Sequence, residues 1–230
     1  MIMHNCDVSP MKEQLKVYLT DIKEMVQNSL DQINNENHCL LSQFDDIRDS
    51  IRKVQSIAAS FYLQCYLSAF TSNYIDLSIT IQHLSERRHG ALIVIQRNDP
   101  LDQMIHSGIP LEANLTYSLL ESVFYPGSPL HDGAVLIQGD RVVSAGNVLP
   151  VSHAVLVNKK MGTRHRAAIG LTEQTDALVL VVSEETGNAS FAFKGTLHPL
   201  SGVDMIVDED TSDAEAFDTD SFEANEETIH

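Results

Sequence analysis

The chain has 230 residues, 43% of them hydrophobic, which is enough for one globular domain with a buried core and an appendage. Its net charge of −17 argues against a nucleic-acid-binding protein, because such proteins need a basic face to displace counterions. The sequence contains no apolar run of about 20 residues and does not begin with a basic stretch followed by an apolar one, so we expect no membrane segment, no signal peptide and a cytoplasmic location.

Residues 1–70 predict an antiparallel helical hairpin. Apolar residues recur at steps of three and four over 11–33 and again over 40–65, a spacing typical of amphipathic helices. Polar residues at 34–38 predict a short turn between them. Two long helices cannot fully bury their apolar stripes against each other, so two roles stay open: packing against the adjacent domain, or oligomerisation and regulation.

Residues 71–203 predict a single α/β domain with a mixed central β-sheet flanked by helices. Residues 71–89 favour a helix that Gly90 closes. Apolar runs predict buried strands, and shorter segments between turns predict their partners, at 91–95, 134–137, 141–146, 177–182 and 189–193. Two further helices are expected, one with Asn114 as N-cap and one beginning at Gly162 and Thr163. The interleaving of strands and helices favours the α/β class.

The last segment, residues 204–230, is strongly acidic. Ten Asp and Glu residues lie between Asp208 and Glu227, without a Lys or Arg, so we expect this tail to be disordered. The three cysteines are widely spaced and are expected to be reduced thiols of a cytosolic protein.

A cluster of cationic side chains opens the predicted helix at Gly162. The N-terminus of a helix attracts anions, because its N–H groups are unpaired and carry partial positive charge. Arg164 and Arg166 add forked donors that suit phosphate oxygens, and Thr163 can cap the helix or donate to a phosphate. The alternative is that both arginines pair with surface acids.

Two acidic segments accompany this cluster. Asp132 is suited to hold a divalent cation or to orient an attacking hydroxyl, with His131 as a possible second ligand. Gly133 lacks side-chain bulk, so we expect a ligand to approach the backbone there. The segment 183–185 directly follows a buried strand, where ligands of α/β sheets usually bind. The alternatives are an Asp-Gly turn and a solvated turn. The standard glycine-rich signatures of P-loop and Rossmann proteins are absent.

Three short motifs together resemble the diadenylate cyclase domain. In order, they are Ser-Pro-Leu-His-Asp-Gly-Ala at 128–134, Gly-Thr-Arg-His-Arg-Ala-Ala at 162–168 and Val-Ser-Glu-Glu-Thr-Gly at 182–187. The resemblance covers roughly residues 72–203. It implies a nucleotidyltransferase that condenses two ATP molecules into cyclic di-AMP and releases pyrophosphate. The hairpin and the lack of a membrane segment resemble the soluble, sporulation-associated member found in Bacillus-type bacteria.

The resemblance also assigns roles to residues. Asp132 would help to activate the ribose 3′-hydroxyl together with a divalent metal ion, Mn²⁺ or Mg²⁺, with His131 and Glu185 as metal-site partners. Leu149 would pack along the adenine, and Asn147 stands where the family often has cysteine. The implied nucleotide-binding set is Gly133, Ala134, Leu149, Gly162, Thr163, Arg164, His165, Arg166, Ser183 and Glu184.

The implied reaction requires two facing domains, because one domain that holds one ATP cannot close the ring. We therefore expect a homo-oligomer with apposed active sites, a hexamer among the candidates, and neither nucleic acid nor membrane as a partner. Two other functions stay open from the sequence. A non-catalytic adenine-nucleotide sensor would bind ATP without forming product, and a helical scaffold with an inert core would bind no nucleotide.

Overall fold

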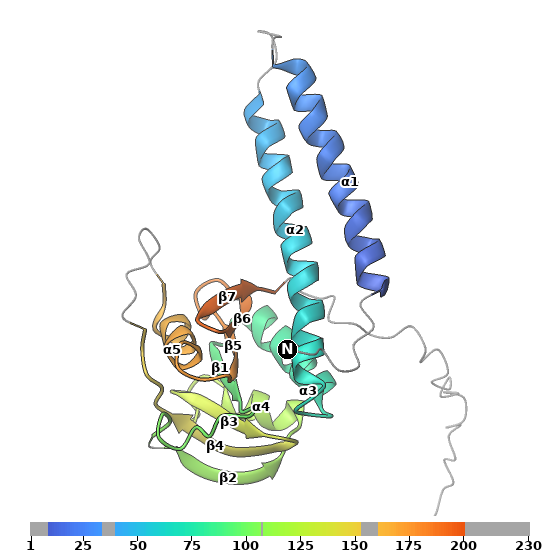
Figure 1. Cartoon of the computed structure of the whole chain (residues 1–230). Helices are drawn as coiled ribbons and strands as arrows, with labels where there is room; N and C mark the ends of the chain where they lie inside the picture. Colours follow the sequence, from blue (N-terminus) through green and yellow to red (C-terminus); the bar gives the residue numbers. More distant parts are fainter. Residues whose placement is uncertain (1–8, 34–39, 107, 153–160, 201–230) are drawn as a thin grey trace, which may run out of the picture.

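The computed structural model describes residues 9–33, 40–106, 108–152 and 161–200, and within them a helical hairpin projects from an α/β unit (Figure 1). The predicted acidic tail and the predicted turn of the hairpin lie outside these residues. The hairpin consists of α1 (Ser9–Gln32) and α2 (Leu40–Leu67). None of the helices in the described ranges has the length and hydropathy of a membrane-spanning segment.

The two hairpin helices are joined near their turn by polar contacts. Ser29 Oγ donates to Gln43 Oε1 over 2.8 Å, and Gln43 Nε2 donates to Gln32 Oε1 over 2.7 Å. Farther down, the ammonium of Lys53 lies 5.0 Å from the ring centre of Tyr18. These contacts fix the antiparallel pairing, but they leave many apolar side chains of the hairpin exposed.

The end of α2 belongs to the core of the α/β unit. Ala59, Leu63 and Leu67 are buried there, whereas no residue of α2 before Ser56 is buried. Cys65, in the same stretch, is disulfide-bonded, so the expectation that all three cysteines are reduced thiols is wrong; Cys6 and Cys39 lie outside the described ranges.

The guanidinium of Arg97 fastens this end of α2 to the sheet. It lies 4.6 Å from the ring centre of Phe70, 5.0 Å from that of Phe193 and 5.8 Å from that of Tyr66. Cations are attracted to aromatic faces at such distances. The segment after α2 and strand β6 therefore both pack against the side chain of Arg97.

The sheet has seven strands in the order β2-β4-β3-β1-β5-β6-β7. The pair β1–β3 is parallel and all the other pairs are antiparallel, so the predicted mixed α/β class is confirmed. The strands are β1 (Ala91–Ile95), β2 (Ile109–Asn114), β3 (Ala134–Gln138), β4 (Arg141–Asn147), β5 (Leu178–Val182), β6 (Ala189–Phe193) and β7 (Thr196–Pro199).

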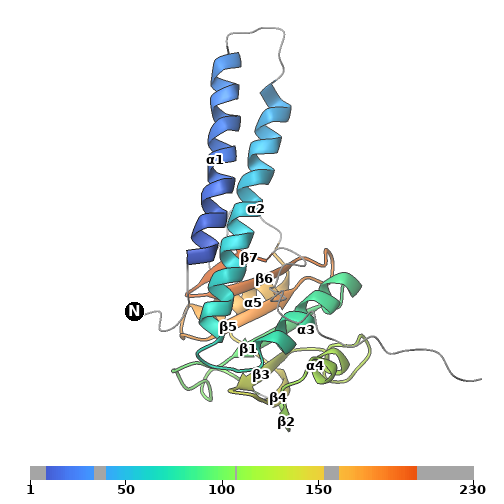
Figure 2. The same cartoon turned by 90° about the vertical axis from the view of Figure 1, so that its right-hand side faces the viewer.

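Helices cover both faces of the sheet (Figure 2). The end of α2 packs on one face with α3 (Tyr74–Arg87) and α4 (Tyr117–Val123), and α5 (Thr163–Thr172) packs on the other. In β1, Ile93 joins the first core cluster and Val94 the second. This alternation explains why the central strands are apolar at every position.

Several boundaries differ from the sequence prediction. The helix after residue 71 ends with Arg88 in the left-handed conformation, at φ 55°, and not with Gly90. The N-cap of α4 is Thr116, whose hydroxyl accepts from Leu119 N over 3.3 Å, and Asn114 ends β2. Strands β2 and β7 were not predicted, because both lie at sheet edges and lack a continuous apolar run.

Asp140, in the β3–β4 turn, ties the start of α3 to the sheet. Its carboxylate accepts from Ser72 Oγ over 2.7 Å, from Thr71 Oγ1 over 2.8 Å and from Ser72 N over 2.8 Å. The hydroxyls of Ser72 and Thr71 thereby lower the pKa of Asp140. The carboxylate is exposed, so solvent screens part of this interaction.

We expect Asp140→Ala to reduce the free energy of unfolding at pH 7 by about 1 kcal/mol. Because the pKa is lower in the folded state, the carboxylate stabilises the fold above its ordinary pKa, and this contribution disappears as the pH falls through the lowered value. Urea denaturation of both proteins from pH 7 down to pH 3 measures the difference. An equal difference at every pH would show that the charge of Asp140 is not involved.

Candidate active site

The topology of the sheet brings the predicted motifs to one end of its central strands, which is called the sheet edge of the site below. Strands β1 and β3 are parallel and begin at this edge, while β4 and β5 run antiparallel to them and end there. Because the order is β4-β3-β1-β5, three segments lie side by side. Asp132 and Gly133 precede β3, Gly90 precedes β1, and Ser183 and Glu184 follow β5.

The start of α5 reaches this edge through an ion pair. Arg164 Nη1 lies 2.8 Å from Glu184 Oε2, with the Arg164 side chain 25% exposed. The hydrogen bond and charge of Arg164 lower the pKa of Glu184, and the charge of His131 lowers it further. Glu184 therefore lies beside Arg164, and the strand order places the aspartate segment at the same end of the sheet.

Asp132 presents an open carboxylate at the site. Its side chain is exposed, and no hydrogen bond or ion pair engages it within the part of the chain that the structure describes. The following Gly133 adopts φ +120°, and a methyl group on its Cα would lie 2.7 Å from the carbonyl carbon of Gly146. We expected Gly133 to make room for a ligand, whereas the structure requires glycine there for its φ and for the close approach of β4.

His131 has a geometry that suits a metal ligand. Its Nδ1 donates to the carbonyl oxygen of Ser128, so Nε2 is the ring nitrogen that a metal ion could bind. Histidines that bind metals usually donate their other ring N–H in this way. Glu185 is exposed in the turn after β5.

The chemistry of these donors fits a cation shared with a substrate. Over the described ranges, no group of three or more His, Cys, Asp or Glu side chains is arranged to hold a metal ion, so His131, Asp132 and Glu185 do not form a complete cage. Mg²⁺ is typically held by one or two carboxylates together with substrate phosphates. Asp132 can supply such a carboxylate, and His131 can add a nitrogen ligand.

The first turn of α5 supplies donors for an anion. Gly162 is the N-cap and offers no side chain to the free N–H groups, so Thr163 is the first helical residue and not the cap. Arg166 is exposed and has no ion-pair partner among the residues that the structure describes. Burial lowers the pKa of His165, which keeps its ring neutral at pH 7. These groups can bind phosphate oxygens through N–H and guanidinium donors.

The turn that carries Glu184 is held from within and from α3. Ser183 Oγ accepts from Thr186 N over 3.3 Å, and Gly187 N donates to the Ser183 carbonyl over 2.8 Å. Ser85, near the end of α3, donates its hydroxyl to the Gly187 carbonyl. The hydroxyl of Ser183 therefore has a structural task, beside any contact with a nucleotide.

Comparison with known proteins identifies the family of this chain. The family model described as DisA bacterial checkpoint controller nucleotide-binding matches residues 78–197, and the model described as diadenylate cyclase CdaS, N-terminal, matches residues 2–70. The chain belongs to the diadenylate cyclase family. All the segments that meet at the sheet edge lie within 78–197.

Individual members of the diadenylate cyclase family are similar over most of the chain. Diadenylate cyclase CdaS of Bacillus thuringiensis is 48% identical over 86% of this chain and 100% of its own length. Cyclic di-AMP synthase CdaS of Bacillus subtilis is 49% identical over 82% of this chain and 91% of its own.

Solved structures show the same fold. A hypothetical membrane spanning protein from Bacillus cereus superposes with a TM-score of 0.72 at 47% identity, over 84% of this chain and 94% of that one. DacA from Staphylococcus aureus superposes with a TM-score of 0.53 at 42% identity, over 56% of this chain and 85% of that one.

The predicted adenine contact, Leu149, is more buried than the charged residues of the candidate site. Leu149 is 6% exposed and packs with Ala134 and Ala167 between the sheet and α5. Asn147 is buried beside it, and its Nδ2 donates to the Ala134 carbonyl over 2.8 Å. The asparagine thus joins β3 to β4, and the place of Leu149 beside an adenine stays a prediction.

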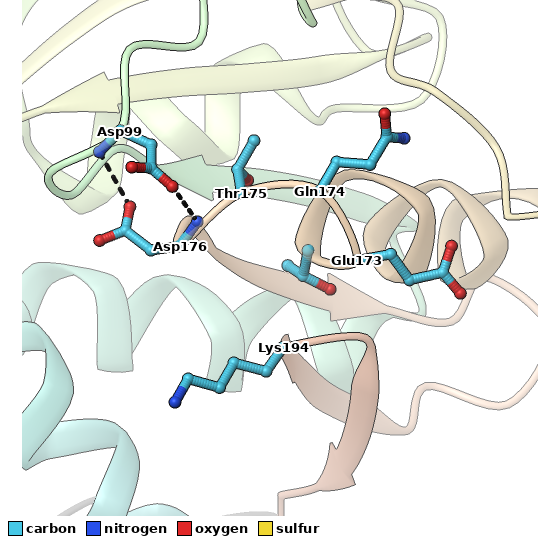
Figure 3. Close-up of a pocket in the computed structure, with 7 residues that line it drawn as sticks. Asp99, Glu173, Gln174, Thr175, Asp176 and Lys194 are labelled. Atoms are coloured by element: carbon cyan, nitrogen blue, oxygen red, sulfur yellow. Dashed lines mark hydrogen bonds between the residues drawn. The ribbon is translucent and has the colours of Figure 1, made fainter.

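A separate hollow of about 330 Å³ lies at the opposite end of the central strands (Figure 3). Asp99 N donates to Asp176 Oδ1 over 3.0 Å, and Asp176 N donates to Asp99 Oδ2 over 2.8 Å. These carboxylates join the end of β1 to the start of β5. The hollow contains none of the predicted site residues, and its lining is Asp99, Thr172, Glu173, Gln174, Thr175, Asp176 and Lys194.

Proposed function

We propose that two copies of this diadenylate cyclase face each other and join two ATP molecules into cyclic di-AMP. The observation that carries the proposal is the meeting of three groups at one sheet edge: the open carboxylate of Asp132, the ion pair of Arg164 with Glu184, and the free N–H groups of α5. An acid for the attacking hydroxyl and donors for a triphosphate are the parts that nucleotidyl transfer needs.

In each half-reaction, the 3′-oxygen of one ATP bonds to the α-phosphorus of the other. The bond between that phosphorus and the bridging oxygen to the β-phosphorus breaks, pyrophosphate leaves, and the hydroxyl proton is lost. Two half-reactions close the ring. Arg164, Arg166 and neutral His165 bind the triphosphate of one nucleotide, and Asp132 orients the 3′-hydroxyl. Alignment and charge neutralisation supply most of the rate enhancement in such transfers.

A divalent cation, Mn²⁺ or Mg²⁺, held by Asp132 and His131 would neutralise phosphate charge and favour ionisation of the 3′-hydroxyl. Glu185 is the third proposed ligand. The remaining proposed contacts are those of Thr163, Ser183 and Glu184 with the triphosphate, of Leu149 with the adenine, and of Gly133, Ala134 and Gly162 with the nucleotide.

Mass spectrometry of the reaction tests the function directly. We expect the full-length protein, incubated with ATP and Mn²⁺ or Mg²⁺, to yield cyclic di-AMP and pyrophosphate in a ratio of one to two. Binding of ATP without product would support a nucleotide sensor instead. Absence of both binding and product would support a scaffold with an inert core.

We also propose that the hairpin holds the domains in an assembly that limits productive pairing. Leu30 and Phe44, near the tip, are 56% and 53% exposed, and other apolar residues along both helices are similarly open. Contiguous exposed apolar surface usually marks an interaction site. A second copy of the hairpin has the matching character, since closed homo-oligomers use the same patch on each subunit.

The combined substitution of Leu30→Glu and Phe44→Glu should reduce the assembly to smaller species and change the turnover per subunit. Light scattering coupled to size exclusion measures the mass, and the product assay measures turnover. The matched control is Asn28→Glu with Ser42→Glu, which adds the same charge at exposed polar positions. Unchanged mass and turnover in the apolar variant would favour simple packing of the hairpin.

A further inference from the structure

Gly90 is a glycine that the backbone conformation does not explain. It is buried at the end of the connection from α3 to β1, and its φ is not positive. The left-handed residue that ends α3 is Arg88. Alanine could therefore adopt the backbone conformation of Gly90, and the reason for glycine must lie in the surroundings.

The guanidinium of Arg164 occupies the space where a side chain of residue 90 would be. A methyl group on the Gly90 Cα would lie 2.4 Å from Arg164 Nη1 and 2.8 Å from Arg164 Cζ. It would also lie 3.0 Å from Glu184 Cβ. The planar group thus rests on the Gly90 backbone while its Nη1 donates to Glu184.

We propose that Gly90 is a positioning residue for Arg164, acting through the room that its missing side chain leaves. Two contacts then determine where the guanidinium lies: the Gly90 backbone beneath it and the Glu184 carboxylate beside it. This inference rests on the proposed function, in which Arg164 binds the triphosphate. It adds β1 to the elements that shape the phosphate site.

A side chain at residue 90 would displace the guanidinium of Arg164 and not the backbone. The backbone before β1 is fixed by the sheet, whereas the end of an arginine side chain is flexible. In Gly90→Ala the guanidinium therefore has to leave its place and its bond to Glu184. The fold should change little, but the forked donor should no longer point where the triphosphate binds.

We expect Gly90→Ala to weaken ATP binding about ten-fold, the scale of one lost charge-assisted hydrogen bond, and to leave adenosine binding unchanged. Calorimetric titration of the full-length protein with ATP and with adenosine separates the two effects. In an Arg164→Ala background, Gly90→Ala should have no further effect on ATP affinity. Wild-type ATP affinity in Gly90→Ala, an equal loss for adenosine, or losses that multiply in the double variant would each overturn the proposal.

Measurements of the melting temperature distinguish a loss of ATP affinity from a loss of folded protein. If Gly90→Ala lowers the melting temperature, most of that loss should disappear in Arg164→Ala/Gly90→Ala, where only Glu184 Cβ, at 3.0 Å, stays close to the methyl group; a loss of the same size in both backgrounds would overturn the proposal. Gly139→Ala is the control, because Gly139 has φ +57° in a turn at the other edge with nothing within 4 Å. It should lose stability and keep ATP affinity. Failure of the wild type to form cyclic di-AMP would refute the function, whereas these binding data judge Gly90 separately.

Discussion

Replacing Asp132 with asparagine should abolish most cyclic di-AMP formation and leave ATP binding largely intact. Asparagine has the same size, and the carboxylate has no partner in the described part of the chain, so the fold should not suffer. What is lost is the negative charge that orients the 3′-hydroxyl and holds a cation. We expect kcat to fall about a thousand-fold, a typical loss for such a group.

The experiment pairs a single-turnover assay of cyclic di-AMP with a calorimetric titration of ATP. Asp21→Asn is the matched control, since Asp21 is an exposed aspartate on α1, a helix of the hairpin that projects from the α/β unit (Figure 1). It should retain full turnover. If Asp132→Asn also retained full turnover, the role assigned to Asp132 would be wrong, whatever the fate of the other site residues.

Arg164→Ala should weaken ATP binding by about ten- to a hundred-fold, because hydrogen bonds to charged groups contribute about 1.5–3 kcal/mol. Stability should change little, since the lost ion pair with Glu184 involves an exposed carboxylate. The pKa of Glu184, which Arg164 lowers, should also rise toward its ordinary value.

Arg164→Lys sharpens this prediction. Lysine keeps the charge but lacks the fork that can bind two phosphate oxygens, so we expect an intermediate affinity. Arg52→Ala on α2 is the control, because Arg52 is an exposed arginine whose ion pair with Asp49 lies on the hairpin. Equal ATP affinity in wild type and Arg164→Ala would remove Arg164 from the phosphate site.

The sequence predicts the parts of this fold whose signals are local. The hairpin follows from the three- and four-residue spacing of its apolar positions, and β1 and β5 follow from runs that are buried on both faces. Strands β2 and β7 escape prediction because edge strands bury few side chains and depend on pairing with distant segments. The cap at Thr116 was missed because Asn114, two residues earlier, is an equally good capping residue by type.

In the candidate site, too, the residue types can be predicted from the sequence, but their spatial arrangement cannot. The residue types of Asp132, Arg164 and Glu184 indicate phosphate chemistry in the sequence, but their meeting depends on the strand order, which no local pattern contains. Gly90 shows the limit most clearly. Its position after a helix suggested a C-cap, whereas the contact that accounts for it comes from a residue 74 positions later in the chain. Only the tertiary structure could reveal that contact.

Helix α2 passes without interruption from the exposed hairpin into the core of the catalytic unit, where Arg97 clamps the segment that follows it. The orientation of the catalytic unit relative to the hairpin therefore depends on the helical phase of α2. Each residue inserted between the exposed and buried halves of α2 would rotate the catalytic unit by about 100° about the axis of α2, relative to the hairpin. If two copies pair through their hairpins, as proposed above, the length of α2 decides whether their catalytic ends face toward or away from each other.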